Sequence, residues 1–490
     1  MAINRRHFLR RSSCAAISAA AFASGVEKFG LINVFAQQPE AVADYKALVC
    51  IFLAGGNDGN NTVVPLDDYT NYSNARSAAG LALLQSQLLP INPPGRQLGL
   101  HPNLSPEVAN AGVMKGVLEV WNQGKLAIVA NVGNLVQPIT RTQYQQNIGR
   151  PYQLFSHSDQ VAQQQSGISS APAQTGWGGL VADRMIAVNG SAPLPMIISI
   201  SGTSLFATGK LTRQLAVSAA PTQLNQLLPL TMTGDVGNVR RVTYDALRGF
   251  DTGFSLVKAS SDTTTQALVA GAALGTDPTL VTVFPNSSLG NQLKQVAKLI
   301  KANLTQGALG LSRQIFFCSL GGFDNHSNQT GSNPTNPAGG GANSGNQGSL
   351  LAQLSQGMRA FYDFTTNVNN DLPGIGSIAS QVTQFTMSDF GRTLQPSGSG
   401  AATVGSDHAW GNQLFVMGDA VLGGKLYGTY PTLAMGGPDD ADTRGRWIPT
   451  TSIDAYAATL AQWYGLPSSD VSLVFPSIGK FPTSNLGFLS

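Results

Sequence analysis

The chain has 490 residues, of which only 11% are charged and 42% are hydrophobic, with 55 glycines and a formal net charge of +3. Average soluble proteins are roughly 25% charged, so uncharged polar residues must cover much of the surface. This length suffices for one large or two ordinary domains with a complete core, and the composition indicates a globular protein.

The N-terminal segment predicts export. Residues 4–10, NRRHFLR, place paired arginines before an apolar pair and a base, and this pattern resembles the bacterial twin-arginine export signal. The weakly apolar run at 14–24 is too short for a membrane span, and small-x-small cleavage sites lie at 21–23 and 34–36. We therefore expect a signal over residues 1–36 that the twin-arginine export machinery recognises, with a basic surface helix as the alternative. The mature chain would have no transmembrane segment and would lie in the periplasm or outside the cell.

Removal of this signal changes the charge balance. Residues 1–36 contain five bases and one acid, so the net charge would change from +3 to −1. The mature chain then gives no indication of nucleic acid or an anionic membrane as a partner. Cys50 and Cys318 both lie within apolar strand patterns, which favours buried thiols over a disulfide or metal ligands.

The first strand carries the first candidate site residue. Residues 45–53, YKALVCIFL, form a nearly continuous apolar run, which predicts a strand buried on both faces. In residues 54–62, AGGNDGNNT, the glycines allow a tight turn that leaves Asp58 projecting from the strand end, although an ordinary polar turn is the alternative. A helix at 108–123 and a second buried strand at 125–132 complete a predicted βαβ unit with a right-handed crossover.

Two serines begin the next predicted helix. In residues 155–160, FSHSDQ, Ser156 or Ser158 would lie at the helix N-terminus, where free N–H groups and the helix dipole favour anions. Either serine is therefore a candidate nucleophile or a contact to a substrate anion. Simple capping of the helix is the alternative.

The remaining pattern indicates an α/β fold. Residues 203–288 are rich in Ser and Thr and weakly amphipathic, which indicates an inserted, mostly helical cap region near the mouth of the site, and residues 330–349 form a low-complexity loop. We expect a single domain over residues 37–490, built on a doubly wound, mostly parallel sheet with helices on both faces. Its other predicted elements are a helix at 177–185, a strand at 193–202, a helix at 289–304, a strand at 314–320, a helix at 350–369, a strand at 381–387, a short hairpin or edge piece at 424–431 and a closing helix at 453–464.

Acids follow three of the predicted strands, which end near residues 53, 320 and 387. If these strands are parallel, the acids leave the same edge and repel one another unless a cation lies between them. Imidazole with carboxylate suits Zn²⁺, Mn²⁺ or Fe, and sets of oxygen ligands suit Ca²⁺ or Mg²⁺. We therefore predict one or two divalent metal ions, with Zn, Mn, Ca and Mg all open, and six candidate ligands: Asp58, Asp324, His326, Asp389, Asp407 and His408.

Arg392 lies three residues after Asp389. Its planar guanidinium could clamp a tetrahedral anion such as a phosphate or sulfate group. A salt bridge to Asp389 is the alternative.

Several motifs resemble those of an exported bacterial family, the domain of unknown function 1501. They are FLAGGNDGNNTVVP, LHPNLSP, LGGFDNHSNQ, MSDFGRT, SDHAWGN and GGKLYGTYP. That family is itself similar to the alkaline phosphatase and sulfatase superfamily, so the resemblance implies an alkaline-phosphatase-like, doubly wound α/β fold with a two-metal site.

The resemblance also implies roles for individual residues. Asp58 stands at the position of the superfamily's first-strand metal ligand. Asp324 and His326 resemble its acid–histidine pair, with one intervening residue instead of three. His408 resembles the last metal-binding histidine, and Asp407 is a possible substitute ligand.

The sequence departs from the superfamily pattern in two respects. Asp389 resembles the acid of an Asp-His pair, but Phe390 stands where the histidine is expected. No residue matches the superfamily's nucleophile, for which Ser156, Ser158 and Thr62 are the candidates. The Cys-x-Pro-x-Arg signature of sulfatases is absent.

These features favour an exported metal-dependent hydrolase that acts on an anionic ester substrate, either a phosphate or a sulfate ester. The alternative is a non-catalytic secreted binding or assembly protein on a degenerate hydrolase fold, which the missing nucleophile and Phe390 favour. A third hypothesis, a metal-free serine hydrolase pairing Ser156 with His408, lacks the G-x-S-x-G elbow.

Overall fold

The computed structural model describes residues 44–104, 116–224, 234–306, 309–330, 346–400 and 403–490. The predicted export signal, most of the predicted low-complexity loop and the first part of the predicted helix at 108–123 lie outside these ranges.

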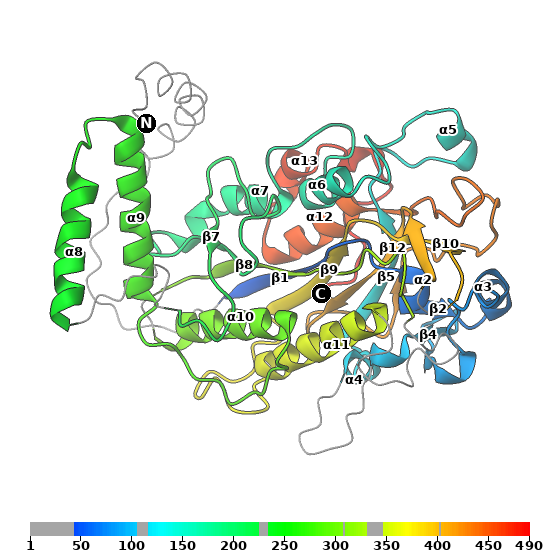
Figure 1. Ribbon diagram of the computed structural model, residues 1–490, viewed down its shortest axis with the longest axis horizontal. Coiled ribbons are helices and arrows are strands. Elements are labelled where there is room, and N and C mark those ends of the chain that lie inside the picture. Colours follow the sequence, from blue (N-terminus) through cyan, green and yellow to red (C-terminus); the bar gives the residue numbers. More distant parts are fainter. Residues whose placement is uncertain (1–43, 105–115, 225–233, 307–308, 331–345, 401–402) are drawn as a thin grey trace, which may run out of the picture.

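A nine-stranded sheet forms the centre of the molecule (Figure 1), in the order β13-β5-β12-β9-β1-β8-β6-β7 with β14 paired to β5. Every pair is parallel except those of β12, which runs antiparallel to β5 and β9. The predicted mostly parallel α/β sheet is therefore confirmed. The strands are β1 (Lys46–Leu53), β5 (Leu126–Gly133), β6 (Ile197–Ser199), β7 (Leu215–Ala216), β8 (Arg313–Leu320), β9 (Val382–Ser388), β12 (Asn412–Met417), β13 (Leu426–Tyr427) and β14 (Thr451–Ser452).

Helices cover both faces of the sheet (Figure 1). The side chains of β1 alternate between two cores, with Val49 and Ile51 in one and Leu48 and Cys50 in the other. Because both faces are covered, the strand reads as a continuous apolar run. One face packs on α4 (Val117–Asn122), α10 (Ser288–Thr305) and α11 (Asn346–Thr365), and the other on α7 (Trp177–Arg184), α12 (Ile453–Tyr464) and α13 (Val471–Val474).

Smaller elements surround this body. A three-stranded antiparallel sheet consists of β2 (Val63–Pro65), β4 (Leu98–Leu100) and β3 (Leu89–Ile91), and β10 (Arg392–Ser397) pairs with β11 (Gly405–His408). The other helices are α2 (Gly59–Thr62), α3 (Tyr69–Arg76), α5 (Arg141–Gln145), α6 (His157–Ser166), α8 (Gly234–Gly249), α9 (Ser255–Ala273) and the 3-10 turns Gln85–Gln87, Pro102–Leu104, Ile186–Asn189, Ser468–Asp470 and Ile478–Lys480. No helix in the described part of the chain combines the length and apolar character that a membrane span needs.

The first two buried strands, for which the sequence predicts a βαβ unit, are not neighbours in the sheet. β1 and β5 run in the same direction, but β9 and β12 lie between them. β12 was not predicted, because its apolar run is short and follows a polar, glycine-rich stretch.

The predicted helical cap is not confirmed. The described part of residues 203–288 contains the helices α8 and α9, and it adds strand β7 to the sheet edge beside β6. In Figure 1 these helices stand at the end of the molecule opposite β10. Because α8 and α9 follow β7, the edge strand of the sheet, they lie far from the central strands. They therefore do not cover the strand ends that are described next.

Cys50 and Cys318 are buried free thiols, as the sequence predicts. They belong to the two different cores and so lie on opposite faces of the sheet. Burial raises the pKa of both thiols well above the ordinary value, which suppresses the reactive thiolate.

In a native chain that begins at residue 37, we expect neither Cys50 nor Cys318 to react with Ellman's reagent, whereas both thiols should react in guanidinium chloride without reductant. A deficit of thiols in the denatured, unreduced protein would instead reveal a disulfide.

Candidate metal centre

The carboxyl ends of three neighbouring strands meet at one edge of the sheet. In the parallel ladders of β1, Leu53 pairs with Leu320 of β8 on one side and with Ser388 of β9 on the other. Asp324 follows β8 after a Gly-Gly turn, and Asp389 follows β9 directly. Two of the three predicted strand-end acids therefore leave the sheet side by side.

Three imidazoles converge on Asp324. The Nε2 atoms of His326, His157 and His408 lie 3.1, 3.4 and 3.7 Å from its Oδ1 atom. His157 comes from the first turn of α6 and His408 from the end of β11, so the chain brings them from distant segments. The Nε2 atoms of His326 and His408 are 2.9 Å apart.

The other nitrogen of each ring contacts an acceptor. The Nδ1 atom of His157 lies 2.7 Å from Asp389, that of His326 lies 2.9 Å from Asp407, and that of His408 lies 2.8 Å from the carbonyl of Phe155. Because each acceptor requires a proton on Nδ1, the neutral rings carry their lone pairs on Nε2. We assign these tautomers from the partners. Metal-binding histidines show this arrangement, in which the second nitrogen donates to a carboxylate or carbonyl.

The inward-facing atoms lack a donor. The Nε2 atom of His157 is buried and has no hydrogen-bond partner among the described residues. With the tautomers assigned above, the Nε2 atoms of His326 and His408 point two lone pairs at each other across a hydrogen-bonding distance. These lone pairs repel each other unless a proton or a cation lies between them.

The spacing of these atoms fits a metal ion. A tetrahedral zinc site with nitrogen ligands at about 2.0–2.1 Å places its ligand atoms about 3.3 Å apart. The distances from Asp324 Oδ1 to the three Nε2 atoms, and the distance between the Nε2 atoms of His326 and His408, bracket this value. His157, Asp324 and His408 can all offer ligand atoms within 4.8 Å of one another. The side chains of Asp324 and His326 are 51% and 45% exposed, so solutes can reach the centre.

Electrostatics keeps two of these residues in the forms that bind metal. Burial alone would raise the pKa of Asp324, but the hydrogen bond and charge of Arg392, with smaller effects of His326 and His157, lower that pKa. Burial lowers the pKa of His408, the hydrogen bond to the Phe155 carbonyl opposes this with a smaller effect, and the charge of Arg392 lowers the pKa further. Asp324 is therefore ionised and His408 neutral near pH 7.

Arg392 does not face solvent as an anion clamp. Its side chain is 0% exposed, and it donates to Asp324 at 2.6 Å and to the carbonyls of Gly55, Gly56, Phe323 and Ser406. Arg392 also does not form the alternative salt bridge to Asp389, because its guanidinium pairs with Asp324. Arg392 ties the strand-end loops together and orients Asp324.

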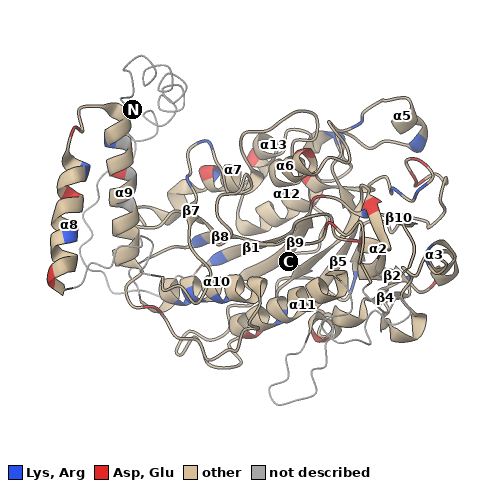
Figure 2. Ribbon diagram, in the orientation of Figure 1, with Lys and Arg blue, Asp and Glu red and all other residues tan. Residues whose placement is uncertain are grey.

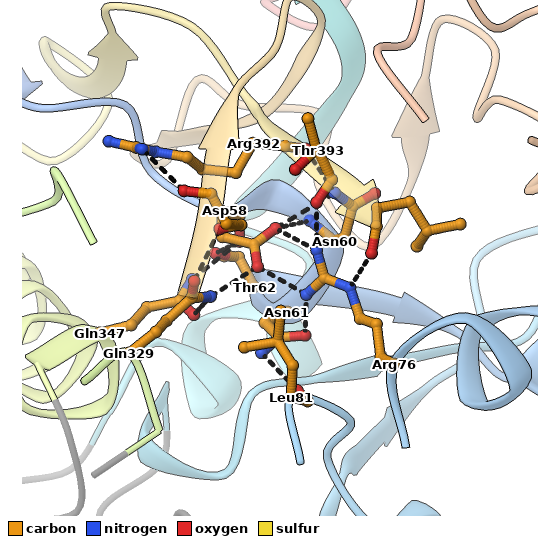
Figure 3. A network of polar contacts seen from close by, with 12 residues as sticks. Asp58, Asn60, Asn61, Thr62, Arg76, Leu81, Gln329, Gln347, Arg392 and Thr393 are labelled. Carbon is orange, nitrogen blue, oxygen red and sulfur yellow. Dashed lines mark hydrogen bonds and ion pairs between the residues drawn. The ribbon is translucent and has the colours of Figure 1, made fainter. Parts of the chain in front are cut away.

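Asp58 forms a buried ion pair instead of facing the imidazoles (Figure 3). Its carboxylate contacts Arg76 at 2.6 Å, with side-chain exposures of 2% and 0%. Asn60 and Gln329 donate to the same carboxylate, which also caps α2. With both oxygens occupied, the predicted role of Asp58 as a metal ligand is not supported by its contacts.

The other predicted site residues have supporting positions. Asp389 accepts from the Gly55 N–H at 3.0 Å and orients His157, and Asp407 lies between His326 and Arg444. Burial would raise the pKa of Asp407, but Arg444 and His326 lower it. Both acids therefore orient imidazole rings, whereas the sequence analysis predicted them as direct metal ligands.

The candidate nucleophiles are engaged elsewhere. The hydroxyl of Ser156 donates to Asp159 at 2.6 Å, and that of Ser158 contacts the same carboxylate at 3.3 Å. Thr62 is buried and bonds to Asn57 and to the Asp58 carbonyl. The residue of this helix start that reaches the centre is His157.

The sequence did not indicate a role for His157, because this residue does not follow a predicted strand and so was not grouped with the strand-end acids. It lies in the first helical turn between Ser156 and Ser158, whose hydroxyls were the predicted functional groups. The scarcity of histidine was the available signal, since residues 37–490 contain only four. The fourth, His101, is buried, accepts from Asn103 and has a pKa that burial lowers to about 3, which fits a structural role.

Comparison with known proteins places the chain in a family. The sequence model of the family described as "Protein of unknown function (DUF1501)" matches residues 45–441. The chain belongs to this family. The DUF1501 match includes every residue of the centre, from the Gly55 turn to His408, and ends before helix α12.

The other comparisons add no functional information. A solved structure titled "Crystal structure of Ps i-CgsB in complex with k-i-k-neocarrahexaose" aligns over 89% of this DUF1501 chain and 76% of that chain, with 9% identity and a TM-score of 0.32. A likeness at this level carries no argument about fold or function. No curated protein matches the chain.

We expect Arg76→Met to destabilise the protein by about 3–5 kcal/mol, because it leaves the Asp58 carboxylate buried without its partner. Urea unfolding of the metal-free protein measures this. Arg96→Met is the matched control, since the ion pair of Arg96 with Asp67 is about one-third exposed and should contribute at most about 1 kcal/mol. Equal losses in both variants would contradict a central role for the buried pair.

Proposed function

We propose that this protein is a metal-dependent hydrolase of phosphate or sulfate esters that holds one divalent ion through His157, His326, His408 and Asp324. The observation that carries the proposal is the convergence of three Nε2 atoms on one carboxylate oxygen, while the Nδ1 atom of each ring contacts another acceptor. Such a set is costly in the folded protein unless a cation occupies its centre.

The ligand chemistry narrows the choice of metal. Three imidazole nitrogens and one carboxylate suit Zn²⁺ or a similar transition metal, whereas Ca²⁺ and Mg²⁺ prefer oxygen ligands. When bound, such an ion supplies Lewis-acid chemistry that polarises an ester oxygen.

The charge of the centre supports an anionic substrate. With neutral imidazoles, the carboxylates of Asp324, Asp389 and Asp407 and the guanidiniums of Arg392 and Arg444 leave one net negative charge. A divalent cation would change this to one net positive charge. The loaded centre would then attract an ester that carries phosphate or sulfate.

The residues of the chain position the centre. Asp389, Asp407 and the Phe155 carbonyl orient the imidazoles, and Arg392 orients Asp324. The buried ring of Phe390 packs against His157 and His408, with centroids 4.7 and 4.8 Å away, and excludes water from their inner side.

Water is the nucleophile in this proposal. Its oxygen forms a bond to phosphorus or sulfur, the bond to the ester oxygen breaks, and the leaving oxygen takes a proton. No serine or threonine adduct is needed, which agrees with the other partners of Ser156, Ser158 and Thr62.

Because the hydroxyls of Ser156, Ser158 and Thr62 bond to other groups, the centre lacks a side-chain nucleophile. This also favours a second candidate, a non-catalytic binding or assembly protein with a metal centre. Turnover separates the two candidates. In either case, residues 1–36 predict export through the twin-arginine machinery to the periplasm or the exterior, a route that carries folded proteins.

We expect the purified mature chain to bind about one equivalent of Zn²⁺ or a similar transition metal by mass spectrometry of the metal content. His157→Ala and His408→Ala should each lower the affinity by at least about 100-fold, and Asp389→Asn by about 10–100-fold because it releases the His157 ring.

Ser158→Ala is the matched control, because this exposed serine neighbours His157 but bonds to Asp159. Its metal affinity should equal that of the unchanged protein. If the unchanged protein binds no metal, or if both histidine variants bind metal as tightly as the unchanged protein, the metal centre is refuted.

We expect hydrolysis of a panel of aryl phosphates, phosphodiesters and aryl sulfates to require the metal. A chelator should abolish the activity, added metal should restore it, and His408→Ala should lower it by at least about 100-fold. A fully metal-loaded protein that turns over none of these esters would favour the non-catalytic candidate.

A further inference from the structure

The loop that contains residues 436–446 is anchored beside the metal centre. The buried carboxylate of Asp440 accepts the N–H groups of Gly436, Asp442, Gly445 and Arg446 at 2.8–3.2 Å. One acid therefore fixes both ends of the loop. Figure 2 shows acidic and basic residues together on the loops around β10.

Arg444 extends from this loop to the support of His326. Its Nη2 atom donates to Asp407, whose other oxygen contacts His326, and its Nε atom donates to Gln395. The side chain is 34% exposed. Its Nη1 atom has no partner among the described residues.

Arg446 extends to the support of His408. Its Nε atom donates to the His408 carbonyl at 2.9 Å, and its Nη1 atom lies 3.1 Å from Asp442. The guanidinium stacks over the ring of Phe155, 4.3 Å from its centroid, and is 21% exposed. Its Nη2 atom likewise has no partner among the described residues.

We propose that Arg444 and Arg446 form an oxyanion-binding site at the rim of the metal centre, which takes the phosphate or sulfate group of an ester. Two partly exposed guanidiniums on an immobilised loop, each with a terminal N–H group to donate, suit a tetrahedral oxyanion. Arg392, for which the sequence analysis raised this role beside that of a salt bridge, is buried and fully engaged.

This inference rests on the proposed function for its substrate, but the anion site stands on its own contacts. Arg444 and Arg446 adjoin residues that hold His326 and His408, so an anion there lies next to the predicted reaction centre. Binding of an inorganic anion can be measured in the zinc-loaded and the metal-free protein alike.

The test is calorimetric titration of the mature chain with inorganic phosphate, with sulfate and acetate as further arms. We expect phosphate and sulfate to bind more tightly than acetate, and Arg444→Gln and Arg446→Gln each to weaken phosphate binding by about tenfold in protein saturated with zinc. Arg241→Gln is the control, because its side chain is 68% exposed on α8 at the far end of the molecule. It should bind phosphate normally.

Arg444→Lys separates anion binding from structural support. Lysine can keep a charge contact to Asp407 but lacks the planar fork, so we expect full zinc content with weakened phosphate binding. If Arg444→Gln loses both zinc and phosphate and Arg444→Lys restores both, Arg444 acts only as a support and the proposal is wrong.

The two failures are distinguishable. If the unchanged protein cannot bind zinc but binds phosphate through Arg444 and Arg446, the metal centre is refuted and the anion site stands. A zinc-loaded protein that binds phosphate equally well in the unchanged chain and in the double glutamine variant, or in neither, refutes the anion site and keeps the metal centre.

Discussion

The whole centre depends on the close approach of three strand-end loops around the Gly55 peptide. Its N–H donates to Asp389 and its carbonyl accepts from Arg392. A Cβ atom on Gly55 would lie 2.4 Å from the backbone nitrogen of Asp324, and the residue has a φ of +113°. Only glycine fits such a position without displacing a neighbour. The pairing of β1 with β8 and β9 brings the three loops to one edge of the sheet, and the close approach at Gly55 then fixes the positions of Asp324 and Asp389.

The acids that gather at this edge are neutralised in two different ways. Asp58 turns inward and pairs with the buried Arg76, whose guanidinium also donates to carbonyls of β10. Asp324 and Asp389 stay with the imidazoles, and Arg392 offsets only part of their charge. The buried pair stabilises the framework, whereas the residual charge in the accessible centre makes a cation favourable there.

The sequence predicted the parts of the fold that local pattern determines. The buried strands at 45–53 and 314–320 and the helix at 453–464 agree closely with β1, β8 and α12, because apolar periodicity and caps are local. The antiparallel strand β12 and the remote position of α8 and α9 depend on tertiary packing. In the site, strand-end acids could be predicted from topology, but the approach of His157 from α6 and the loss of Asp58 to Arg76 could not, since both depend on partners far along the chain.

The contacts also argue for one ion where the family resemblance suggests two. A second ion would need Asp58, whose oxygens are occupied by Arg76, Asn60 and Gln329, and a histidine at Phe390. The Phe390 ring instead packs against the imidazoles, and a Cβ atom on Gly56 would lie 2.5 Å from it. Because the ring and the glycine fit each other closely, the apolar side chain is part of the centre's packing. The single ion that we propose, held mainly by nitrogen, is therefore consistent with the occupied oxygens of Asp58 and with the apolar ring of Phe390.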